Sequence, residues 1–258
     1  MQTIAIIDAD PTIYAAACVG EERFINVKHL PSGNVKEFKN KTEFYGRKKD
    51  KSGGWLGEIN AERELSGRRA FPLDSFEIEE CSRVVEDISN VLHSAKMMLQ
   101  SASNSVGADS YVCYVGGKQE LFRWKQSNML EYKGTRKNML SPLLKGDVTN
   151  YILKHHSGIL CNDDKEADDY CIIRAVEEAS KGNRAIVITS DKDVLGNPVL
   201  SFNPNKPDLG IQNGDQFGSL YLDDKGDVRG IGRIFKYWQW AFGVPTDNYR
   251  ANACSDIK

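Results

Sequence analysis

The sequence predicts an α/β fold, with a mostly parallel central sheet and helices on both faces. Short apolar runs at Thr3–Ile7, Tyr111–Val115 and Ala185–Thr189 have the length and composition of buried strands. Longer segments with apolar residues at helical spacing lie between them, and strands that alternate with helices usually pair in parallel. The chain has 258 residues, of which 40% are hydrophobic. This is enough for one large domain that carries an insertion.

The elements can be assigned in chain order. The first strand leads into a helix that Pro11 opens and that ends near Val19. Further on, Asp74 or Ser75 is expected to cap a long helix, Phe76–Ser101, with an apolar stripe along one side. The expected elements that follow are the strand Tyr111–Val115, a helix opened by Ser141-Pro142, the strand Ile159–Cys161, the helix Lys165–Ser180, the strand Ala185–Thr189, a hairpin of Leu220–Leu222 with Val228–Gly230, and the aromatic helix Ile231–Phe242, expected to pack in the core.

Residues 21–74 differ in character from the rest of the chain. Phe24–Lys28 and Val35–Phe38 flank the turn sequence Pro31-Ser-Gly-Asn, which predicts a β-hairpin. A basic, glycine-rich loop follows at 46–54. We expect this region to be an insertion lying over the sheet and not a separate domain.

Acidic residues gather where ligands bind in sheets of this kind. Asp8 directly follows the first strand, and Asp191 follows the last one in Ser190-Asp-Lys-Asp. Because the carboxyl ends of parallel strands meet at one sheet edge, these carboxylates are expected to converge. Carboxylates crowded in one crevice repel each other unless cations neutralise them, and Mg²⁺ and Mn²⁺ prefer oxygen ligands. The expected metal ligands are Asp8, Glu166, Asp168, Asp169, Asp191, Asp193 and Asp247.

Each acidic group also has a purely structural interpretation. Asp10 is interpreted as a cap for the helix that follows it. Acids in a first helical turn complement the helix dipole, which accounts for any one acid of Glu166-Ala-Asp-Asp but not for all three. Asp191 could instead cap the short turn that follows the strand, but such a turn does not require a second aspartate at Asp193.

A basic segment lies between the second strand and the next helix. Cations there can neutralise phosphates, and a glycine lets the backbone approach a phosphodiester chain. A solvated loop with incidental charge is the alternative. The residues expected to contact a phosphodiester backbone are Arg123, Lys125, Tyr132, Lys133, Arg136 and Lys137.

Five motifs follow one another along residues 3–248. They are Asp8 after the first strand, Tyr132-Lys-Gly-Thr-Arg, Glu166-Ala-Asp-Asp, Ser190-Asp-Lys-Asp and Gly243-Val-Pro-Thr-Asp-Asn. In this order they resemble the flap endonuclease and bacteriophage 5′→3′ exonuclease family, whose nuclease domain is PIN-like. The resemblance implies that Lys133 and Arg136 hold the scissile phosphate, beside the acidic residues that hold metal.

The chain departs from the family pattern in three places. Val115-Gly-Gly stands where the family often has an aspartate, and Val244 replaces the first aspartate of the last motif. The sequence ends at Lys258, where family members continue into a helix–three-turn–helix module. We therefore expect one nuclease domain over 1–258, with an insertion at about 21–74 and that module incomplete or absent.

The resemblance implies a nuclease that depends on one or two Mg²⁺ or Mn²⁺ ions and hydrolyses DNA phosphodiesters. A 5′→3′ exonuclease or a structure-specific flap endonuclease is expected, acting on duplex with a 5′ end or flap, with RNA open as a second substrate. A monomer in the cytoplasm is expected, the host's if the protein is phage-encoded. No run of about 18 apolar residues predicts a membrane span.

Two other functions stay open at this point. Asp8-Ala-Asp-Pro-Thr matches the opening motif of haloacid dehalogenase-like phosphatases, in which Asp8 would be the nucleophile. That interpretation leaves the basic segment and Asp247 unexplained. The second alternative is a DNA-binding protein with a degraded nuclease site, because the family pattern is incomplete here.

Overall fold

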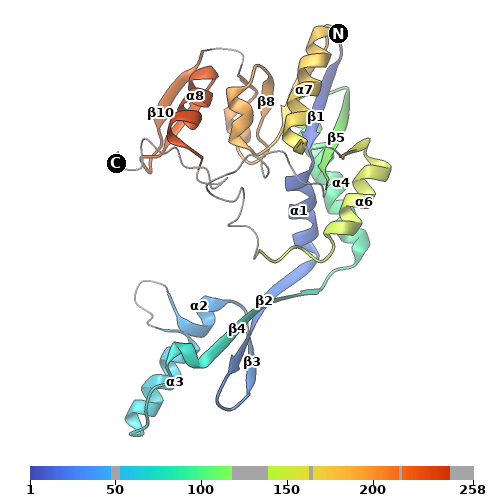
Figure 1. The fold of residues 1–258 in the computed structure, drawn as a ribbon. Coiled ribbons are helices and arrows are strands. Elements are labelled where there is room, and N and C mark those ends of the chain that lie inside the picture. The colour runs from blue at the N-terminus through green and yellow to red at the C-terminus, as the bar shows by residue number, and fades with distance from the viewer. Residues whose placement is uncertain (48–52, 118–138, 163–164, 215–216, 245–258) are drawn as a thin grey trace.

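The computed structural model describes residues 1–47, 53–117, 139–162, 165–214 and 217–244. At its centre lies a six-stranded sheet in the order β6-β5-β1-β7-β8-β9 (Figure 1). Its strands are β1 Thr3–Asp8, β5 Ser110–Gly116, β6 Gly158–Cys161, β7 Arg184–Ile188, β8 Leu200–Phe202 and β9 Gln212–Asn213. All neighbours pair in parallel except β8 and β9. The predicted mostly parallel sheet is confirmed.

Helices cover both faces of this sheet, as the sequence predicted. The helices are α1 Asp10–Val19, α4 Ile88–Ser105, α6 Lys145–His155 and α7 Ala167–Ser180. In β1, Ala5 and Ile7 pack into a core with α1, α4 and α6, whereas Ile6 packs into a second core with α7. This alternation arises because successive side chains of a strand point to opposite faces. Helix α6 begins at Lys145, slightly later than expected.

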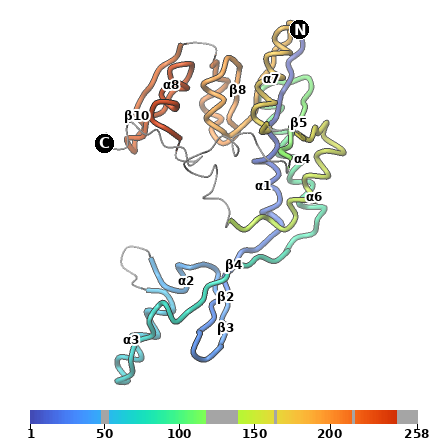
Figure 2. The backbone as a smooth tube through the Cα atoms, viewed as in Figure 1, coloured from blue at the N-terminus to red at the C-terminus, as the bar shows by residue number. Residues whose placement is uncertain are grey.

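Residues 21–84 form an arm that extends away from the central sheet (Figures 1 and 2). Its elements are β2 Glu21–His29, β3 Val35–Phe38, α2 Lys41–Tyr45, α3 Gly54–Leu65, the 3₁₀ helix η1 Leu73–Ser75 and β4 Phe76–Val84. The three strands pair antiparallel in the order β3-β2-β4. Ile25, Val27, Phe38, Phe44 and Leu56 form a hydrophobic core of the arm's own. The predicted hairpin is confirmed, but the expected position over the central sheet is wrong.

The long helix expected over Phe76–Ser101 is wrong in its first third. Residues 76–84 are the strand β4, and α4 begins only at Ile88 with Asp87 as its N-cap. Nine residues of β4 pair with β2, a contact between segments some fifty residues apart. Phe76 and Ile78 pack on the arm's core, and the alternation with the glutamates between them is a strand signal that the helical stripe obscured. The arm thus extends to Val84, beyond the expected boundary at about 74.

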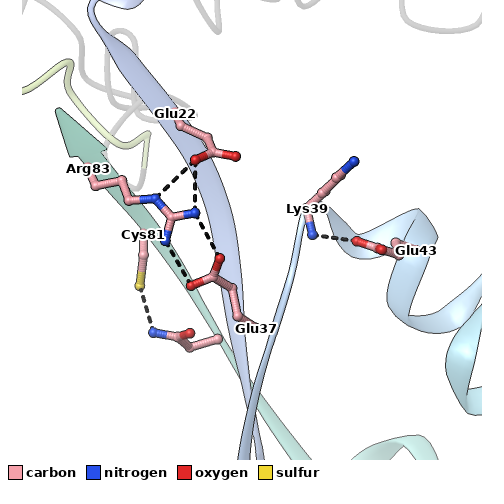
Figure 3. A network of polar contacts seen from close by, with 7 residues as sticks. Glu22, Glu37, Lys39, Glu43, Cys81 and Arg83 are labelled. Carbon is pink, nitrogen blue, oxygen red and sulfur yellow. Dashed lines mark hydrogen bonds and ion pairs between the residues drawn. The ribbon is translucent and has the colours of Figure 1, made fainter. Parts of the chain in front are cut away.

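Arg83 links the three strands of the arm on the side of the sheet opposite its core (Figure 3). The guanidinium of this β4 residue lies 2.8 Å from Glu22 of β2 and 3.0 Å from Glu37 of β3. All three side chains are about half exposed. Ion pairs in such settings contribute on the order of 0–1 kcal/mol each, so the arm depends mainly on its aromatic core.

The C-terminal part of the described chain adds a hairpin and a helix beside the end of the sheet. Its elements are the 3₁₀ helices η3 Lys192–Gly196 and η4 Pro207–Leu209, the strands β10 Ser219–Leu222 and β11 Val228–Ile231, and the helix α8 Arg233–Phe242. The predicted hairpin and final helix are confirmed. The expected core packing of the α8 aromatics holds for Phe235 but is wrong for Trp240, which is 59% exposed. Within the described residues, no helix is long and apolar enough to cross a membrane.

Candidate metal centre at the carboxyl end of the sheet

Asp8 and Asp191 are brought together by the pairing of β1 with β7. Ile7 is in register with Ile188, so Asp8 and Thr189 lie next to each other as the strands end. The Thr189 hydroxyl donates to Asp8 Oδ2 over 3.0 Å. The same oxygen of Thr189 accepts a hydrogen bond from the backbone N–H of Asp191 over 3.1 Å. One buried threonine therefore fixes both acidic segments at the strand ends.

The Asp8 carboxyl is buried and electrostatically unfavourable when ionised. Burial raises its pKa from 3.8 to about 7, with further contributions from the negative charges of Asp10 and Asp191. Hydrogen bonds from Thr189 and from the Asp10 backbone N–H lower the pKa and only partly offset this effect. A cation in the crevice would favour the ionised form and relieve the repulsion.

Asp10 lies at the end of β5 and does not cap a helix. The N-cap of α1 is Ala9, without any side-chain capping bond, so the interpretation of Asp10 as a cap is wrong. Its Oδ1 accepts a hydrogen bond from the backbone N–H of Gly116 over 3.0 Å. A Cβ at Gly116 would lie only 2.5 Å from Asp10 Oδ2. The glycine therefore admits the Asp10 carboxylate to the place where β5 ends.

The three acids at the start of α7 divide into two roles. Glu166 and Asp169 form a capping box, in which each side chain accepts a hydrogen bond from the other's backbone N–H. Burial raises the pKa of the Cys171 thiol, and the negative charges of Asp8 and Asp168 raise it further. Helix capping thus accounts for Glu166 and Asp169, whereas Asp168 Oδ1 accepts a hydrogen bond from the Asp169 N–H over 2.9 Å.

Asp193 belongs to the short helix η3 that follows β7. Asp191 is the N-cap of η3, and its side chain accepts a hydrogen bond from the Asp193 N–H over 3.0 Å. The Asp193 carboxylate in turn accepts a hydrogen bond from Gln239 on α8 over 2.5 Å. Gln239 is 6% exposed, and the sequence did not indicate it as a site residue because it lies among aromatic residues in a helix expected to form core.

The donor chemistry of this crevice fits a hard divalent cation, since all the acidic side chains supply oxygen. The negative charges of Asp10 and Asp191 raise the pKa of Asp8. In the described part of the chain, however, no three acidic, histidine or cysteine side chains are grouped so as to hold a metal ion. Asp10, Asp169 and Asp193 are instead held by protein hydrogen bonds. Asp8, Asp10 and Asp191 thus lie at one edge of the sheet, and in the described residues they do not form a preassembled metal cluster.

Several predicted site residues lie outside the described residues. The predicted metal ligand Asp247 falls in 245–258. The six expected DNA-binding residues all fall in 118–138: Arg123, Lys125, Tyr132, Lys133, Arg136 and Lys137.

The described chain just after this basic segment is fixed to the base of the arm. Glu21, whose side chain is only 1% exposed, accepts hydrogen bonds from the Leu143 backbone N–H and from Arg23, both at 2.8 Å. Arg23 also donates to the Leu140 carbonyl and to the Tyr14 hydroxyl of α1. The start of the arm, α1 and residues 140–143 are therefore joined by one buried carboxylate and its arginine.

Two solved structures have a similar fold. A T5 protein co-crystallised with metal ions matches with a TM-score of 0.52 and 12% sequence identity, over 98% of this chain and 71% of that chain. A mutant of T5 5′-exonuclease matches with a TM-score of 0.51 and 12% identity, over 98% of this chain and 68% of that chain. The chain has the fold of these T5 proteins. This agrees with the fold that the five motifs implied. No family model matches the chain, and no curated protein matches its sequence.

Proposed function

We propose that the protein is a divalent-metal-dependent nuclease that hydrolyses DNA phosphodiester bonds, acting from or near a 5′ end. The central sheet with its helices would be the nuclease domain, and residues 21–84 an insertion in it. The observation that carries the proposal is the convergence of Asp8, Asp10 and Asp191 at the carboxyl ends of β1, β5 and β7. This is the edge at which α/β sheets of this kind bind their ligands.

The residues divide into proposed roles. Asp8, Asp10, Asp168, Asp191 and Asp193 would hold Mg²⁺ or Mn²⁺, while Glu166 and Asp169 contribute charge from the capped start of α7. A divalent ion bound there would act as a Lewis acid and lower the pKa of an attacking water.

Thr189 fixes the carboxylate of Asp8 and the backbone of Asp191 before substrate arrives. Lys133 and Arg136 are proposed to hold the scissile phosphate, an arginine being suited to pairing with it through two hydrogen bonds. Asp247 is proposed as a further ligand from the last motif. These three assignments depend on the sequence motifs.

The choice of a 5′ end depends on two similarities. The motif order resembles the 5′→3′ exonuclease and flap endonuclease family, and one solved structure of similar fold is named a 5′-exonuclease. The basic segment before α6 supplies cations suited to a nucleic-acid backbone.

The test is cleavage of end-labelled DNA by wild-type protein and by Asp191→Ala, with Asp208→Ala as the matched control. Asp208 is an exposed aspartate in η4 and belongs to none of the five motifs. With Mg²⁺ or Mn²⁺, we expect wild type and Asp208→Ala to shorten a 5′-ended duplex or remove a 5′ flap. Asp191→Ala should lose at least a hundredfold of this rate and keep its circular dichroism spectrum.

Three outcomes would contradict the proposal. Undiminished cleavage by Asp191→Ala would remove the carboxylate crevice as the active site. Binding of DNA without cleavage in either metal would favour a degraded nuclease. Release of inorganic phosphate from a small phosphomonoester, without any cut in DNA, would favour a phosphatase.

A further inference from the structure

We propose that Gln239 of α8 is a positioning residue that orients the Asp193 carboxylate for divalent-metal binding. The inference deepens the proposed nuclease function and depends on its metal site. It identifies a residue outside the five sequence motifs and assigns α8 a role in the site.

The geometry of the contact carries the inference. The Gln239 Nε2 donates to Asp193 Oδ1 over 2.5 Å, and the Gln239 side chain is almost completely buried. A buried amide needs a hydrogen-bond partner, so this donor cannot turn to solvent at low cost. The carboxylate is therefore fixed in direction by a residue forty-six positions away.

Other contacts along the same face of α8 fix the backbone that carries Asp193. Lys236 Nζ donates to Asn197 Oδ1 over 3.0 Å, and Asn197 Nδ2 donates to the Asp193 carbonyl over 2.8 Å. Helix α8 thus holds Asp193 in two ways. Gln239 bonds its carboxylate directly, and Lys236 holds Asn197, which bonds its carbonyl.

Gly196 allows α8 to lie this close to η3. A Cβ at Gly196 would be 2.9 Å from the Lys236 Cβ, so the helix backbone passes directly against η3. At the start of α8, the Gly232 N–H donates to the Leu195 carbonyl over 2.8 Å. Contacts at 232, 236 and 239 follow one stripe of the helix, which holds the turn 193–197 as a unit.

The consequence concerns metal affinity. Partners that orient a metal ligand reduce the motion it must lose on binding, and their removal typically costs about 10–100-fold in metal affinity or activity. Because no three ligands are preassembled among the described residues, the orientation of each carboxylate matters more. Removing the Gln239 amide should weaken metal binding more than it weakens the fold.

The test measures stabilisation by Mn²⁺ in thermal unfolding, together with the Mg²⁺ concentration that gives half-maximal DNA cleavage. The variants are Gln239→Leu, which removes the donor, and Gln239→Glu, which keeps the shape but repels Asp193. Gln100→Leu is the control. It replaces glutamine by leucine in a different helix, α4, which is remote from α8. We expect both Gln239 variants to raise the Mn²⁺ and Mg²⁺ midpoints about tenfold or more, and Gln100→Leu to leave them within twofold.

The outcomes distinguish failure of the positioning role of Gln239 from failure of the proposed nuclease function. If the Gln239 variants lower the melting temperature but keep wild-type metal midpoints, Gln239 is only structural and the inference is overturned. The same holds if Mn²⁺ fails to stabilise wild type. If wild type cuts no DNA while Gln239→Leu still weakens the Mn²⁺ effect, the positioning role stands and the nuclease proposal fails. Should Gln239→Leu not fold, Gln239→Glu decides by the same measurements.

Discussion

The Thr189 hydroxyl at the end of β7 donates a 3.0 Å hydrogen bond to the Asp8 carboxylate at the end of β1. Thr189 is 3% exposed, and it also accepts the hydrogen bond of the Asp191 N–H. A single hydroxyl thus connects two acidic segments that are far apart in the chain. The role of each segment in the site depends on this bond.

Replacing Thr189 by valine should change both stability and the ionisation of Asp8. The variant keeps the shape but removes the donor to a buried carboxylate, at a cost of about 1–2 kcal/mol in the free energy of unfolding. Because the Thr189 bond lowers the pKa of Asp8, its loss should move the acidic limb of the pH–cleavage profile to higher pH. Thr189→Ser, which keeps the hydroxyl, is the control. An identical profile for valine and wild type would contradict this role.

Asp8→Asn should stabilise the metal-free protein at alkaline pH. Burial and the neighbouring charge of Asp10 raise the pKa of Asp8 from 3.8 to about 7, so the folded state favours its protonated form. The contribution of this group to stability is complete below about pH 4 and is lost as the pH rises through 7. With chelator at pH 8, Asp8→Asn should gain on the order of 2 kcal/mol, or about 4–8 °C in melting temperature.

Two comparisons check the cause of that gain. At pH 5 the difference between variant and wild type should be smaller than at pH 8, and it should nearly vanish only below about pH 4, where the carboxyl is protonated in both the folded and the unfolded state. Adding Mg²⁺ at pH 8 should raise the melting temperature of wild type but not of Asp8→Asn. If Asp8→Asn is less stable than wild type at pH 8 in chelator, burial and the charge of Asp10 do not destabilise the ionised Asp8 carboxylate.

Gly116→Ala should displace the Asp10 carboxylate while leaving the fold intact. The added Cβ would meet Asp10 Oδ2 at 2.5 Å, and the end of a side chain can move more cheaply than backbone. We expect a change in melting temperature below about 3 °C, together with a loss of cleavage rate that matches Asp10→Ala. Gly146→Ala in α6 is the control, because its Cβ would enter open space. Full activity of Gly116→Ala would show that the position of Asp10 is unimportant.

The sequence predicted the central strands and Asp8 and Asp191 at their ends because continuous apolar runs and the residues after them are local signals. It could not predict that the Asp10 carboxylate accepts a hydrogen bond from the Gly116 N–H, since that contact joins residues 106 positions apart. Gln239 was missed for the same reason, as its burial depends on η3 packing against α8. The helix expected over 76–84 was wrong because pairing with β2, a long-range contact, decides between the two periodicities there.

Glu21→Gln should loosen the attachment of residues 140–143 to the base of the arm. The buried carboxylate accepts hydrogen bonds from the Leu143 N–H and from Arg23, and a neutral amide cannot serve both donors equally well. We expect a loss of about 1–3 kcal/mol in the free energy of unfolding by urea. Hydrogen exchange of the Leu143 amide should become faster than in wild type.

Glu22→Gln supplies the matched control for this prediction. It makes the same chemical change one residue along β2, where the partner Arg83 and the carboxylate are both about half exposed. Its cost should stay within about 0.5 kcal/mol, because an exposed ion pair contributes little. The basic residues between Arg123 and Lys137 are proposed to bind DNA, so Glu21→Gln should also bind 5′-flap DNA more weakly than Glu22→Gln. Equal stability and equal DNA affinity of the two variants would show that Glu21 does not hold this segment.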